Sequence, residues 1–74
     1  MVYIVTTEFE APHGWRINNL ACVNDTLERA IREAEHLRDQ FKAVEDPNFL
    51  GAAIYEAEFN QTHTPRLIEY IQAL

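Results

Sequence analysis

Four glutamates at alternate positions of two apolar segments are the first residues whose spacing could serve a function. Glu8 and Glu10 close one segment, and Glu56 and Glu58 close another. Residues two apart in a β-strand share a face, so each pair is expected on one side of a sheet. We interpret the four carboxylates as the acidic part of a partner-binding face that attracts a basic surface. The alternative is that they form an ordinary solvated face.

Two further side chains are candidates for partner binding. Trp15 follows an expected turn at 11–14, which is typical of an interface hot spot, although it could instead cap one end of a small core. Arg38 falls inside the apolar stripe of an expected helix. It could anchor an acidic group of a partner, or it could lay its stem on the core and send its head to water or to Glu45.

The single cysteine, Cys22, is the only nucleophile of its kind in the chain. A catalytic role would require a base, and nothing in the spacing brings His13, His36 or His63 to it. We therefore expect Cys22 to be a small buried side chain.

Other signatures of catalysis and of cofactor binding are absent from the sequence. There is no glycine-rich phosphate loop, because Gly14 and Gly51 stand alone, and the chain contains no serine. No Cys and His spacing suits zinc. A glutamate pair on an open sheet face lacks the walls that perturb a pKa. We expect no enzymatic activity, no metal and no cofactor.

Length and charge narrow the function further. The 74 residues predict one small domain, 1–74, with a core so limited that self-association would help to stabilise it. One cysteine excludes an intrachain disulfide. A net charge of -6 disfavours direct binding to nucleic acid or to an anionic membrane and favours a basic protein surface. The absence of a long apolar run predicts a soluble, cytoplasmic protein.

The longest periodic segment, 25–44, predicts a helix. Its apolar residues recur every three or four positions, Asp25 is a suitable N-cap with Glu28 three residues later, and Pro47 bars continuation. Before it, 2–10 is rich in β-branched and aromatic residues and predicts a strand, whose Tyr3 side should face the helix. Segment 15–23 is a weaker candidate for a second strand that completes a hairpin.

After the helix, 49–59 predicts a third strand, and Thr64 followed by Pro65 predicts the start of a short closing helix. Small residues at Gly51, Ala53 and Ala57 suggest that their side faces the long helix. The outer face would then carry an apolar part, which could be a partner site or a homodimer seam, or could be covered by the closing helix. This apolar part comprises Val2, Ile4, Leu50, Ala52 and Ile54.

Together these elements predict an α+β fold, a small two-layer α/β sandwich of order β-β-α-β-α. The sheet would have three mostly antiparallel strands with the first strand in the centre and both helices on one face.

The expected function is a small acidic, non-enzymatic interaction module. It would be an inhibitor or adaptor that blocks a basic, nucleic-acid-binding surface of a larger protein, as phage anti-defence proteins of the anti-CRISPR type do; the likeness is one of size and charge and not of motif. The alternative is a homodimeric structural or accessory domain. A less favoured alternative is a small-ligand enzyme or sensor built around Arg38 and Cys22.

Overall fold

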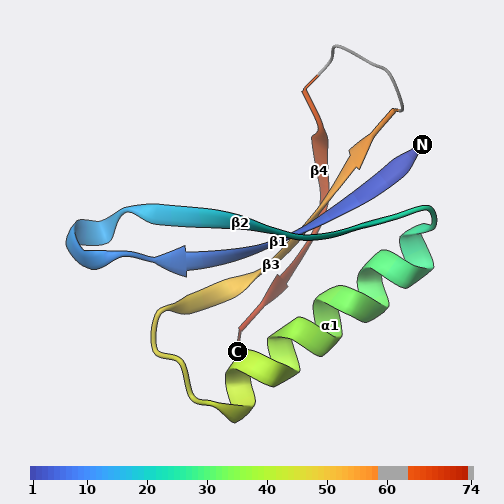
Figure 1. Cartoon of the computed structure of the whole chain (residues 1–74). Coiled ribbons are helices and arrows are strands. Elements are labelled where there is room, and N and C mark those ends of the chain that lie inside the picture. Colours follow the sequence, from blue (N-terminus) through green and yellow to red (C-terminus); the bar gives the residue numbers. More distant parts are fainter. Residues whose placement is uncertain (59–63, 74) are drawn as a thin grey trace.

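The computed structural model describes residues 1–58 and 64–73, and this part of the chain forms one four-stranded sheet and one α-helix (Figure 1). The small α+β class is therefore confirmed. In chain order the elements are β1 (Val2–Glu10), a 3-10 turn η1 (Pro12–Gly14), β2 (Arg16–Asn24), α1 (Leu27–Ala43), β3 (Phe49–Ala57) and β4 (Arg66–Gln72).

The sheet has the strand order β2-β1-β3-β4, and every neighbouring pair is antiparallel. As predicted, β1 lies between two antiparallel neighbours. The prediction of three strands and a closing helix is wrong, because Arg66–Gln72 pairs with β3 as a fourth strand. Seven residues are too few for a stable isolated helix, whereas the edge of β3 offers a row of backbone hydrogen-bonding partners.

Helix α1 lies along one face of the sheet (Figure 1). Ala30 and Ala34 on the helix are fully buried against Val5 of β1 and against Ala52 and Ile54 of β3. Alanine has a short side chain, so the helix approaches the strands closely and the core is thin. Partly buried side chains surround this contact: Tyr3, Cys22, Ile31, Leu37, Ile68 and Ile71.

Three phenylalanines close one end of the layer between helix and sheet. Phe41 stacks on Phe49 with ring centroids 4.7 Å apart, and Phe9 meets both rings edge-on. Aromatic pairs in such geometries add about 0.5 to 1.5 kcal/mol beyond the burial of their area.

From Gly51 onward, each side chain of β3 lies on the opposite face of the sheet from the one predicted. The β1–β3 register shifts between Glu8 and Phe9, so Leu50 is an extra residue on β3. Phe49 keeps its place beside the helix, but every later side chain changes sides. Ala52 and Ile54 consequently belong to the core and not to an outer homodimer seam.

The N-cap of helix α1 lies one residue later than predicted. Thr26, and not Asp25, is the N-cap, and its side chain accepts a hydrogen bond from the backbone N–H of Arg29. At the other end Glu45 adopts a left-handed conformation, with φ of 54°, and its N–H donates to the carbonyl of Lys42. Within the described residues, no helix has the length and apolar character needed to cross a membrane.

Candidate functional site

The sheet face turned away from α1, called here the outer face, has no second layer over it in the described part of the chain (Figure 1). Its residues follow from strand alternation and register, since directly paired residues share a face. They are Arg16, Asn18, Leu20 and Val23 of β2; Val2, Ile4, Thr6, Glu8 and Glu10 of β1; Gly51, Ala53, Tyr55 and Ala57 of β3; and Leu67, Tyr70 and Gln72 of β4. Leu50, the extra residue of β3, has no partner in this register and is placed with them because it lines a hollow together with Arg16 and Tyr70.

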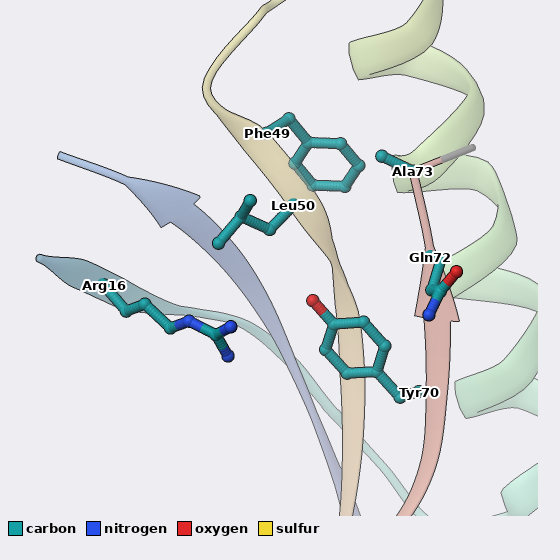
Figure 2. A pocket seen from close by; sticks show the side chains of 6 residues that line it. All are labelled: Arg16, Phe49, Leu50, Tyr70, Gln72 and Ala73. Carbon is teal, nitrogen blue, oxygen red and sulfur yellow. The ribbon is translucent and has the colours of Figure 1, made fainter. Parts of the chain in front are cut away.

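A first hollow of about 490 Å³ lies where the start of β3 meets the end of β4 (Figure 2). Its lining combines polar and apolar groups, namely Arg16, Phe49, Leu50, Tyr70, Gln72 and Ala73. Figure 2 shows the Tyr70 ring lying across β3 and the Arg16 side chain extending toward it from β2. Residues from three strands that are distant in the sequence therefore meet at one place.

Tyr70 can cross β3 because Gly51 has no side chain. A Cβ on Gly51 would lie 2.6 Å from the carbonyl oxygen of Ile71 and 2.9 Å from the Tyr70 hydroxyl oxygen. Glu8, which is opposite Gly51 on β1, is only 8% exposed. The Tyr70 side chain thus contributes to the burial of a carboxylate on the outer face.

The surroundings of Tyr70 stabilise its protonated phenol. Burial is the main cause, followed by hydrogen bonding to Glu8 and by the negative charge of that residue. The positive charge of Arg16 acts in the opposite direction, and the net effect raises the pKa of Tyr70 from 10.0 to about 12. At neutral pH this hydroxyl is therefore a neutral hydrogen-bonding group and not a base.

A second hollow, of about 300 Å³, lies on the outer face near the other end of β1 and has an almost wholly apolar surface. It is lined by Ile4, Thr6, Asn18, Tyr55, Thr64 and Pro65. The Thr6 hydroxyl oxygen is buried and has no hydrogen-bond partner among the described residues. An unpaired buried hydroxyl destabilises the fold unless a bound group satisfies it.

The structure does not bring the four predicted glutamates together. Glu8 and Glu10 lie on the outer face, but Glu56 lies on the helix side, where it pairs with Arg66 at 2.9 Å. Glu58 follows the end of β3 and is exposed. The bulge at Leu50 again explains the difference, because it turns Glu56 to the opposite side.

The other predicted site residues lie apart from the two hollows. Trp15 is 73% exposed beside the turn, so it does not cap the core. The Nε atom of Arg38 is 3.2 Å from the Asp39 carboxylate, and the side chain is 32% exposed. Its partner is thus its neighbour in sequence and not Glu45.

Cys22 is partly buried at the edge of the core, where its sulfur accepts a hydrogen bond from the Asn24 side chain at 3.3 Å. The expected buried cysteine is therefore found only in part, since Cys22 is of intermediate exposure. Of the three histidines, His13 and His36 are exposed, and His63 lies outside the described residues. No group of three His, Cys, Asp or Glu side chains within 1–58 and 64–73 is arranged to hold a metal ion.

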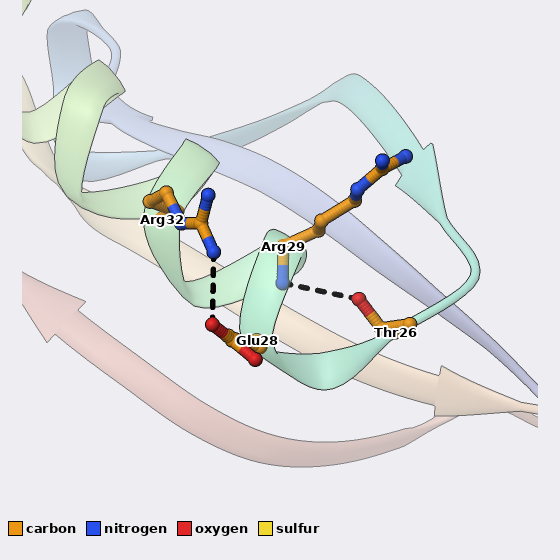
Figure 3. A network of polar contacts seen from close by, with 4 residues as sticks. All are labelled: Thr26, Glu28, Arg29 and Arg32. Atoms are coloured by element: carbon orange, nitrogen blue, oxygen red, sulfur yellow. Dashed lines mark hydrogen bonds and ion pairs between the residues drawn. The ribbon is translucent and has the colours of Figure 1, made fainter.

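Polar contacts at the start of α1 are explained by the formation of the helix. Figure 3 shows the bond from the Arg29 N–H to the Thr26 hydroxyl, at 3.2 Å, and the ion pair between Glu28 and Arg32, at 2.9 Å. Glu28 therefore pairs with Arg32, one turn further along the helix, and not with the backbone N–H of the N-cap residue. An exposed pair of this kind contributes about 0.3 to 0.5 kcal/mol.

Sequence reasoning missed the first hollow because the C-terminal segment was predicted to be a helix. The available signal was Gly51 inside a strand, which often marks the close approach of another group. Comparisons of this chain with protein-family models, with curated proteins and with solved structures found no match.

Proposed function

We propose that this chain is a small, non-enzymatic protein-interaction module that docks its outer face on a basic surface of a larger protein. The observation that supports the proposal is an outer face that no second layer covers within residues 1–58 and 64–73, and on which large apolar side chains stay exposed. Leu20 is 68% exposed, Val23 is 55% exposed and Leu67 is 51% exposed. Leu20 and Val23 lie on one edge strand and Leu67 on the other, and exposed apolar groups on one face are typical of an interaction surface.

The charge of the chain supports a basic partner. The helix with its flanks, 25–46, carries seven acidic and four basic side chains, and the rest of the chain carries five acidic and two basic. The excess of negative charge is therefore shared by the helix and the rest of the chain. The electrostatic field of the whole molecule would then steer a basic partner toward it. Nucleic-acid-binding surfaces are basic, and an inhibitor of the phage anti-defence type would block one of them.

Capture experiments with two matched variants test the proposal. Leu20→Glu places a charge on the outer face, and Val44→Glu places the same charge on a residue of similar exposure, 71%, just after the helix. We expect a column that carries the immobilised wild type or Val44→Glu to capture the same basic protein. A column that carries Leu20→Glu should not capture it. Binding should weaken as salt rises. An acidic partner, or equal capture by both variants, would contradict the proposal.

The second candidate function is a homodimeric accessory domain joined through the same face. It is favoured by the apolar second hollow, because two copies that each carry a charge of -6 can associate closely only through a surface with few charges. Sedimentation separates the candidates. A dimer of the 8.6 kDa chain that persists on dilution and is dissociated by Leu20→Glu would support the homodimer.

A further inference from the structure

The first hollow gathers hydrogen-bond donors around a cavity. The Arg16 guanidinium and the Gln72 amide can both donate, and the Tyr70 ring lies over β3 with Arg16 on its β2 side and Gln72 on its β4 side (Figure 2). None of these described lining side chains is a carboxylate, although the Glu8 carboxylate is hydrogen-bonded to the Tyr70 hydroxyl beside them. Arg16 is the one charged side chain among them, so a ligand that contacts its guanidinium is expected to be anionic.

Arg16 forms no ion pair with the described residues. Three other arginines do so: Arg32 with Glu28, Arg38 with Asp39 and Arg66 with Glu56. Glu10 lies directly across from Arg16 in the β1–β2 register, yet the two side chains are not paired. The guanidinium fork is thus available to a ligand, and it matches a carboxylate in a two-bond arrangement.

The opposite wall of the hollow is apolar. Phe49 and Leu50 supply it, and the end of β4 is held beside them because the Ala73 N–H donates to the Leu50 carbonyl at 3.1 Å. The volume of about 490 Å³ lies within the range of about 300 to 1,000 Å³ that is usual for small-molecule sites. A ligand that fits must therefore join an anionic end to an apolar body.

We propose that the first hollow binds a small organic carboxylate that carries an aromatic or branched apolar group. The carboxylate lies on the Arg16 guanidinium and accepts a further hydrogen bond from the Gln72 amide. The apolar group contacts Phe49 and Leu50. Four of its lining residues belong to the outer face, but the proposal does not rest on the protein interaction proposed for that face.

Calorimetric or NMR titration with 3-phenylpropanoate tests the site, and 3-phenylpropanamide serves as the neutral matched ligand. We expect the wild type to bind the acid at least about tenfold more tightly than the amide, because a charged hydrogen-bonded pair is lost with the amide. Equal affinity for the two ligands, or no saturable binding of the acid, would overturn the proposal.

Two variants and a control locate the binding. Arg16→Gln should weaken binding of the acid about tenfold or more, whereas Arg32→Gln, which removes an exposed arginine near the start of α1, should leave it unchanged. Ala73→Leu keeps the charge of Arg16 but fills the hollow, and it should also abolish binding. Circular dichroism confirms that each variant is folded. Equal losses in Arg16→Gln and Arg32→Gln would show a general effect of charge and would exclude this site.

Discussion

Gly51 and Tyr70 are matched across the β3–β4 pair: a Cβ on Gly51 would lie 2.9 Å from both the hydroxyl oxygen and the Cε1 atom of Tyr70. The missing side chain lets the tyrosine ring lie over β3 and cover Glu8. Tyr70, placed in this way, lines the first hollow.

Gly51→Ala should reduce the free energy of unfolding by about 1 to 3 kcal/mol, because the added methyl group overpacks the site. Urea denaturation measures the loss. In a Tyr70→Ala background Gly51→Ala should reduce the free energy of unfolding by less, since only the contact with the Ile71 carbonyl remains. Gly14→Ala is the control, because its φ of 80° causes strain but no atom lies within 4 Å of its added Cβ. Its cost should be the same in both backgrounds.

Tyr70 should make stability fall at high pH. Its pKa is raised to about 12 in the folded protein, against 10.0 for the ordinary group, so the native state holds the phenolic proton more tightly than the unfolded chain does. This contribution is fully present below pH 10 and is lost as pH rises toward 12. Absorbance of the phenolate and urea melts across this range should show the effect in the wild type. Tyr70→Phe should lack it, and Tyr55→Phe should retain it.

Thr26→Ala should destabilise the protein by about 1 kcal/mol, because the Arg29 N–H loses its acceptor. Asp25→Ala should change stability by less than about 0.5 kcal/mol, since Asp25 is exposed and does not cap the helix. Thermal or urea unfolding of the two variants compares them directly. A larger loss for Asp25→Ala would assign the cap to that residue.

Thr6→Val should stabilise the protein by about 1 kcal/mol. The change removes a buried hydroxyl that has no partner among the described residues and keeps the shape of the side chain. Thr64→Val, at an exposed residue that lines the same hollow, should have little effect. A loss of stability in Thr6→Val would contradict the prediction and would show that the hydroxyl makes a stabilising hydrogen bond.

The candidate site was predicted only in outline. The sequence indicated an outer sheet face with an apolar part, and the half-buried Val2, Ile4 and Leu50 are on it. It could not place Ala52, Ile54 or Glu56, because the bulge at Leu50 is a property of the pairing between β1 and β3. Arg16 and Tyr70 line the same hollow only because Arg66–Gln72 pairs with the edge of β3 and forms β4.

By itself the sequence determined the elements whose signals are local. The alternating residues of Val2–Glu10 give β1 with the predicted bounds, and the apolar stripe of Leu27–Ala43 gives α1 within two residues at either end. Only the tertiary structure decided that Arg66–Gln72 is a strand and which side of β3 meets the helix. The physical reason is that backbone pairing and register join residues far apart in the chain, so no local pattern specifies them.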